Sequence, residues 1–183
     1  MVPFIPFVII MLQTCMKKID YFQGYPQKIR DHFEHLMKNG HIRSYLLKKY
    51  PVGHQINTDK QLYEYANNLK QSFMKKSSPI HKVKYEKQKG LILNALGTHT
   101  FISRNHGGKL KSKHEIRIAE SLKSAPEEML QMLVVHELAH FKEKDHNKAF
   151  YNLCEYMQPN YCEVELDTLL FLSLIDQDEK LYS

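Results

Sequence analysis

The residues best suited to chemistry form the motif His-Glu-Leu-Ala-His at positions 136–140. Histidines four positions apart share one face of a helix and lie about 6 Å apart, so both imidazoles can reach one metal ion. Imidazole nitrogen is a common ligand of zinc, at about 2.0–2.1 Å. Glu137 follows the first histidine and can accept a proton from water at such an ion. The motif therefore predicts one zinc ion (Zn2+) held by His136 and His140, with Glu137 as general base.

A catalytic zinc site needs a third protein ligand and one open coordination position. His146 follows His140 by six residues, the spacing found in extended motifs of this type. Six residues of continuous helix turn through about 600°, which would direct His146 away from His140. The helix must therefore end between them, and the polar segment 143–145 is the expected break. Three glutamates remain as alternative third ligands: Glu143, Glu163 and Glu165.

The helix that carries the motif is expected to be buried, because apolar residues surround it almost completely. Residues 124–127 have the pattern of a capping box with proline in the first turn, so the helix is expected to run from there to about Lys142. Two histidines and a glutamate inside it would be costly without polar partners. A metal ion would supply the partner, with Asp145 or a backbone carbonyl orienting a ligand imidazole. The alternative is a core helix whose histidines are hydrogen-bonded to neighbouring groups.

In the rest of the chain, the sequence predicts helices before and after a group of short strands. Helical spacing of apolar residues predicts helices over 26–50, 58–76, 146–157 and 161–175. Asn39-Gly40 is expected to break the first helix, Thr58 to cap the second and Asp145 to cap the third. The segments that predict strands are 80–85, 91–93, 98–104 and 109–119. The expected fold class is α+β, with helices around a small, mostly antiparallel sheet.

Composition and charge narrow the class of protein and partner. A chain of 183 residues is long enough for one domain with a proper core. The net charge of +6 favours an anionic partner such as a nucleotide or, weakly, a nucleic acid, although a basic surface also serves solubility alone. Three cysteines without regular spacing form neither a disulfide framework nor a zinc knuckle. They are typical of a reducing compartment, and we expect a cytoplasmic protein.

The first 15 residues differ from the rest in character. Residues 4–12 form an apolar run that is too short to span a bilayer and contains Pro6. No positive charge precedes the run, as a signal peptide would require, so no membrane partner is expected. We expect residues 1–15 to be an extension, Met16 to be the natural start and residues 16–183 to form a single domain. A dominant native species beginning at Met1, seen by N-terminal mass spectrometry, would contradict this.

Beyond the motif itself, residues 134–151 resemble the signature of the YgjP-like metallopeptidase family, part of a wider zincin-like group that includes SprT-like and WLM proteases. Further segments similar to this family are Tyr25-Pro26, Thr58-Asp59-Lys60, 94–97 and 107–111. The resemblance extends over about residues 20–175. It implies a zincin-like fold in which the active helix carries two metal histidines and the glutamate, while the third histidine lies downstream.

Three functions are compatible with these residues. The leading expectation is a zinc-dependent peptidase acting on a peptide or protein, with Glu137 moving the protons. The alternative is hydrolysis of a phosphoanhydride bond in a nucleoside triphosphate. Arg104 and Lys109, which flank a predicted turn, are candidate contacts for either substrate, unless they belong to a basic solvated hairpin. A non-catalytic nucleic-acid-binding protein is the third, and Glu137 argues against it because a structural zinc site needs no base.

Overall fold

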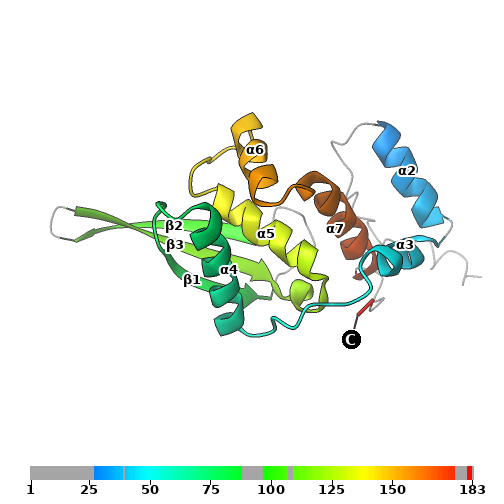
Figure 1. The fold of residues 1–183 in the computed structure, drawn as a ribbon, viewed down its shortest axis with the longest axis horizontal. Coiled ribbons are helices and arrows are strands. Elements are labelled where there is room, and N and C mark those ends of the chain that lie inside the picture. Colours follow the sequence, from blue (N-terminus) through cyan, green and yellow to red (C-terminus); the bar gives the residue numbers. More distant parts are fainter. Residues whose placement is uncertain (1–26, 39, 88–96, 107–108, 176–180, 183) are drawn as a thin grey trace, which may run out of the picture.

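The computed structural model of the chain has a three-stranded sheet, with helices packed against it and further helices packed on those (Figure 1). It describes residues 27–38, 40–87, 97–106, 109–175 and 181–182. The expectations for residues 1–15, for Met16 as the start and for a strand over 91–93 concern residues outside this described part. The α+β class expected from the sequence is confirmed.

The helices and strands follow one another in the order expected. They are α2 (Gln27–Lys38), α3 (Ile42–Lys49), α4 (Asp59–Phe73), β1 (Ile80–Glu86), β2 (Gly97–His106), β3 (Lys109–Ala119), the short 3-10 helix η2 (Glu120–Ser124), α5 (Glu127–Ala139), α6 (Lys148–Met157) and α7 (Tyr161–Ile175). The first predicted helix is indeed divided near Asn39-Gly40, and Gly40 has a φ of 64°. Such a positive φ suits glycine because other residues there place their Cβ too close to the backbone.

The sheet is mixed rather than purely antiparallel. Its strand order is β1-β3-β2, with β3 in the centre. The β2–β3 pair is antiparallel and forms the longer ladder, from Gly97 opposite Ile118 to His106 opposite Lys109. The β1–β3 pair is parallel, ending with Glu86 beside Ala119. Alternating apolar residues indicate which face of a strand is buried, but they do not indicate which neighbour it pairs with.

The core is built around α5, which packs against β2 and β3 on one side and against α6 and α7 on the other. Nine of its residues are buried: Met129, Leu130, Met132, Leu133, Val134, Val135, Glu137, Leu138 and Ala139. Burial of one large apolar side chain contributes about 1.5–3 kcal/mol, whereas a helix cap contributes about 1 kcal/mol. Packing therefore holds α5 in place, as its apolar sequence predicts.

Two of the three predicted helix caps are wrong. Thr58 caps α4 as expected, in a capping box with Gln61. Ser124 instead ends η2, and α5 starts after Pro126 without a side-chain cap. Asp145 does not cap α6, because Asn147 accepts the hydrogen bond from the backbone N–H of Phe150 at 2.9 Å. Several residues of cap-forming type are adjacent at both places, so spacing alone could not select among them.

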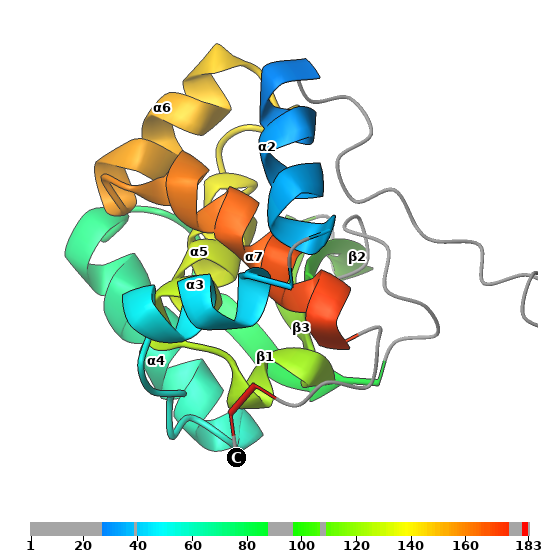
Figure 2. The same ribbon diagram turned by 90° about the vertical axis from the view of Figure 1, so that its right-hand side faces the viewer.

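The helices α3 and α6 pack against α7, whereas α4 packs against strand β1 of the sheet. In Figure 1, α7 lies between α5 and α3, and it packs against both; in the turned view of Figure 2, α3 lies in front. Among the helices in the described part of the chain, none is both long enough and apolar enough to cross a membrane. Because it packs against both, α7 connects the core helix α5 to α3.

Candidate metal centre

The break that the sequence requires lies directly after the second motif histidine. His136 occupies the last turn of α5, and His140 is the residue at which that helix ends. The backbone N–H groups of Lys142 and Glu143 both bond to the carbonyl of Ala139, at 3.0 Å, which closes the turn. Because α6 begins only at Lys148, His146 lies between two helices and its ring can return toward α5.

The three predicted histidines converge. The Nε2 atom of His146 lies 3.1 Å from Nε2 of His136 and 3.2 Å from Nε2 of His140. Two nitrogens bound to one tetrahedral zinc ion would lie about 3.3 Å apart, because each bond is about 2.0–2.1 Å long. Among the described residues, these three side chains are the only group of three or more whose ligand atoms are close enough to hold a metal ion.

The contacts of the Nδ1 atoms of His136 and His140 indicate which nitrogen of each ring carries the hydrogen. Nδ1 of His140 lies 2.9 Å from the carbonyl oxygen of Glu143, which can only accept a hydrogen bond, so Nδ1 carries the hydrogen. A backbone carbonyl, one of the two groups expected from the sequence, therefore orients the ring of His140. Nδ1 of His136 lies 2.7 Å from the hydroxyl of Tyr161. Burial, with the nearby His140 and His146, lowers the pKa of His136 to about 3, so its ring is neutral and suits a divalent cation.

The alternative third ligands are engaged elsewhere. Glu143 accepts a hydrogen bond from the Asn147 amide at 3.3 Å. Glu163 forms an ion pair with Lys49 on α3. Glu165 accepts a hydrogen bond from the hydroxyl of Tyr161 at 3.3 Å. Of the candidates, His146 is the one whose ring nitrogen lies close to both motif imidazoles.

Glu137 is a buried carboxylate that lacks a full set of partners. Only 2% of the residue is exposed, and its Oε2 atom has no hydrogen-bond partner among the described residues. Burial raises the pKa of Glu137 to about 8. An unsatisfied buried carboxylate destabilises a fold by about 1–3 kcal/mol or more. Such an oxygen, on the residue that follows His136 in α5, is suited to a water molecule, a cation or a substrate group. The three imidazoles themselves form a donor set that fits a metal ion.

Comparison with known proteins agrees with this chemistry. Residues 64–167, from α4 to α7, match the family model described as YgjP-like, metallopeptidase domain. The chain belongs to the YgjP-like metallopeptidase family. It is also 47% identical over 158 residues to the UTP pyrophosphatase of Escherichia coli (strain K12), a match that covers 86% of this chain and 95% of the relative. No solved structure gives a significant match. The family and the relative both indicate a hydrolase, and the description of the family indicates a metal-dependent one.

The matched YgjP-like segment also includes the hairpin that carries Arg104 and Lys109. In the β2–β3 register, Arg104 lies opposite Lys111 and Lys109 lies opposite His106. Both positions are close to the end of the hairpin, which extends beyond the helices (Figure 1). Their contact with substrate stays a prediction.

Two aromatic residues of the YgjP-like site were not predicted from the sequence. The ring of Phe150 packs against all three imidazoles, with centroids 4.9 Å from His136 and 4.7 Å from each of His140 and His146. Tyr161, the first residue of α7, contacts His136. Both are fully buried, and both fall at positions where an aromatic residue also fits an ordinary core. The sequence therefore contains no signal that separates them from other core aromatics.

Proposed function

We propose that this chain is a zinc-dependent hydrolase of nucleoside triphosphates that cleaves the bond between the α- and β-phosphates. Water adds to the α-phosphorus and pyrophosphate leaves, so that one triphosphate and one water yield a nucleoside monophosphate and pyrophosphate. Support for this bond is the relative named UTP pyrophosphatase, which matches the chain at 47% identity over nearly its whole length. The net charge of +6 suits a polyanionic substrate. UTP is accordingly the first substrate to test.

The observation that carries hydrolysis is the convergence of three imidazole nitrogens, together with an unsatisfied buried carboxylate on the residue that follows His136. His136, His140 and His146 would hold the ion. When bound, zinc supplies a Lewis acid that lowers the pKa of water and offsets negative charge on a phosphoryl oxygen. Glu137 would accept the proton of the attacking water and return it to the leaving oxygen. Phe150, packed against all three rings, would hold the imidazoles in place and keep bulk water from that side.

A peptidase is the second candidate. It is favoured by the description of the matching family model and by the His-Glu-Leu-Ala-His motif. The same residues would take the same roles, with Glu137 accepting the water proton and passing it to the leaving amine. The two candidates differ in the bond attacked and therefore in the groups that bind the substrate.

A substrate panel separates these candidates. Zinc-loaded protein is incubated with UTP, CTP, ATP and casein, and the nucleotide products are resolved by chromatography. The proposal predicts UMP and pyrophosphate from UTP, with loss of this activity in the Glu137→Gln variant while zinc is retained. Cleavage of casein without turnover of any triphosphate, again lost in Glu137→Gln, would establish the peptidase instead. Formation of UDP and phosphate would contradict the assignment of the bond.

A further inference from the structure

Tyr161, on α7, is a polar neighbour of the metal centre. Its hydroxyl lies 2.7 Å from Nδ1 of His136, and its ring is nearly parallel to the imidazole, with centroids 6.4 Å apart. The residue is fully buried, and its backbone N–H bonds to the carbonyl of Gln158 at the start of α7. The position of the phenol is therefore fixed both by packing and by the beginning of the helix.

The hydrogen on this hydroxyl has a defined direction. Glu165 lies one turn further along α7, on the same face of that helix, and its Oε1 atom accepts from the Tyr161 hydroxyl at 3.3 Å. A carboxylate can only accept, and a phenol has a single hydrogen to donate. With that hydrogen on Glu165, the phenol oxygen has only lone pairs to offer His136. The hydrogen between Tyr161 and His136 must then come from Nδ1 of the imidazole.

We propose that Tyr161, supported by Glu165, is a positioning residue that holds the hydrogen of His136 on Nδ1 and so keeps its Nε2 unprotonated toward the metal. The proposal rests on the metal centre of the proposed function. It gives His136 the same arrangement that the Glu143 carbonyl gives His140. One imidazole is thus oriented by the main chain and the other by a side chain, so only the second can be tested by substitution.

Loss of the Tyr161 hydroxyl is expected to weaken metal binding. Loss of a group that orients a metal-binding histidine typically weakens metal binding by about 10- to 100-fold. Tyr161→Phe removes the hydroxyl while keeping the buried ring. Tyr50→Phe is a matched control, because Tyr50 is also buried and also donates its hydroxyl to a carboxylate on α7, at 2.7 Å from Asp167. Tyr50 makes none of the described contacts of the metal centre.

The experiment measures zinc affinity of the full chain by competition with a chromogenic chelator at one pH, together with the visible spectrum of the cobalt-substituted protein. The proposal predicts about 10- to 100-fold weaker zinc binding and an altered cobalt spectrum for Tyr161→Phe. Tyr50→Phe keeps wild-type values in both measurements. Urea unfolding of the metal-free proteins shows that both variants fold. Equal effects of the two substitutions, or no effect of Tyr161→Phe, would overturn the proposal.

Variants of Glu165 provide an independent check. Glu165→Gln keeps an oxygen that can accept the phenol hydrogen and should bind zinc nearly as wild type does, whereas Glu165→Met should bind it more weakly. Wild-type affinity in Glu165→Met overturns the role of Glu165. If the unaltered protein binds no zinc, both this proposal and the proposed function fail. If it binds zinc but hydrolyses neither UTP nor casein, only the proposed function fails.

Discussion

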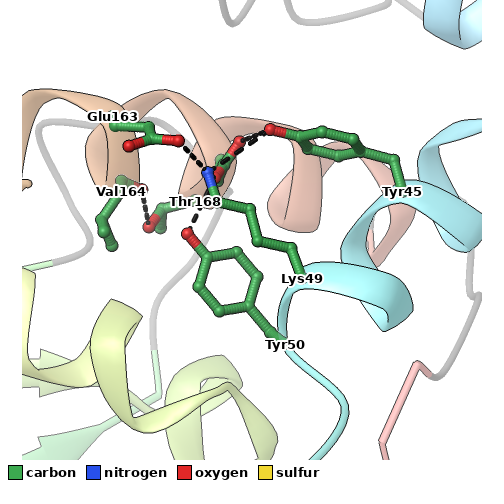
Figure 3. Close-up of polar contacts among 7 residues, drawn as sticks. Tyr45, Lys49, Tyr50, Glu163, Val164 and Thr168 are labelled. Atoms are coloured by element: carbon green, nitrogen blue, oxygen red, sulfur yellow. Dashed lines mark hydrogen bonds and ion pairs between the residues drawn. The ribbon is translucent and has the colours of Figure 1, made fainter.

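Two buried carboxylates, Asp167 on α7 and Glu137 on α5, are equally hidden from solvent and have opposite surroundings. Each is 2% exposed. Asp167 accepts hydrogen bonds from the hydroxyls of Tyr45 and Tyr50, at 2.9 and 2.7 Å, and from the ammonium of Lys49 (Figure 3). Glu137 has an oxygen with no partner among the described residues. The chain therefore satisfies one buried acid fully and leaves the other short of donors.

The difference in hydrogen bonding suits Asp167 to stabilising the fold and Glu137 to the proposed role of proton acceptor. Although burial alone would lower the pKa of Lys49, its hydrogen bonds to Asp167 and Glu163 hold that pKa well above the usual range. Burial and the hydrogen bond to Asp167 likewise raise the pKa of Tyr50. Both donors thus keep their protons at any ordinary pH, and the Asp167 cluster joins α3 to α7. Glu137 has no such fixed donor on Oε2, so it can exchange protons with a bound molecule.

The largest expected effect is on catalysis by Glu137. Glu137→Gln should lower kcat by about 10²- to 10⁴-fold, because a general base contributes about that much. The free energy of unfolding should not fall, since the substitution removes an unsatisfied buried carboxylate. Steady-state kinetics with UTP and urea unfolding measure the two quantities. Wild-type kcat, or a loss of stability comparable to that of an Asp167 variant, would show that the two acids have similar roles.

Metal removal should have the next largest effect, a loss of stability that depends on the histidines of the metal centre and not on the Asp167 cluster. Zinc at about 1,000 times its Kd should raise the free energy of unfolding by about 4 kcal/mol, because it binds the folded state alone. In His146→Ala this increase should shrink sharply, while stability without zinc changes little because His146 is exposed. Thermal unfolding with zinc and with a chelator tests both statements. Equal stabilisation of the two proteins by zinc would remove His146 from the site.

Asp167 should show the reverse behaviour, a loss of stability with little change in chemistry. Asp167→Ala leaves two tyrosine hydroxyls and the partly buried Lys49 without their shared acceptor, which should cost about 3 kcal/mol. Glu163→Ala is the control, because the Glu163 side chain is 61% exposed and exposed ion pairs contribute about 0–1 kcal/mol. Urea unfolding gives both values. Similar losses in the two variants would mean that burial does not decide the strength of this cluster.

The two carboxylates also differ in how far the sequence could reveal them. Glu137 lies within the His-Glu-Leu-Ala-His motif, and the motif's spacing was enough to predict that three histidines converge and that the helix breaks before His146. Asp167 bonds to Lys49 across 118 residues, so no local pattern marks it. Tyr161 is equally hidden, because its contact with His136 depends on how α7 packs against α5. Local spacing thus predicted which histidines converge, while the groups that orient their rings required the tertiary structure.

The same limit applies to the fold. The pattern of apolar residues predicted the described α-helices and strands, because burial imposes it residue by residue, but it did not predict the 3-10 helix η2. The sequence does not indicate the parallel pairing of β1 with β3, because several strands could pair with β1. It does not indicate the cap at Asn147, because another residue of cap-forming type, Asp145, lies close by. A helix cap contributes only about 1 kcal/mol, which is too little to be visible in a single sequence.

The smallest expected effect extends the comparison to a buried imidazole that, like Asp167, is fully satisfied. His54 is 7% exposed, its Nδ1 accepts from the N–H of Ile56 at 3.0 Å, and its Nε2 lies 2.8 Å from the carbonyl of Leu122. The neutral ring suits both contacts, whereas a proton added at Nδ1 would face another N–H group. Burial accordingly lowers the pKa of His54.

Because the folded pKa lies below the unfolded value of about 6.5, the unfolded chain binds the proton more readily in this window. The contribution of His54 to stability is therefore present above about pH 6.5 and declines as the pH falls toward the folded pKa, by at most about 1.4 kcal/mol per pH unit. The free energies of unfolding of metal-free wild type and His54→Gln should converge between pH 7.5 and 5.5 in urea titrations. The comparison between the two proteins cancels the titration of the other histidines. A constant difference across that range would mean that the ring of His54 takes up a proton without losing its contacts, and that satisfied burial does not protect its neutral form.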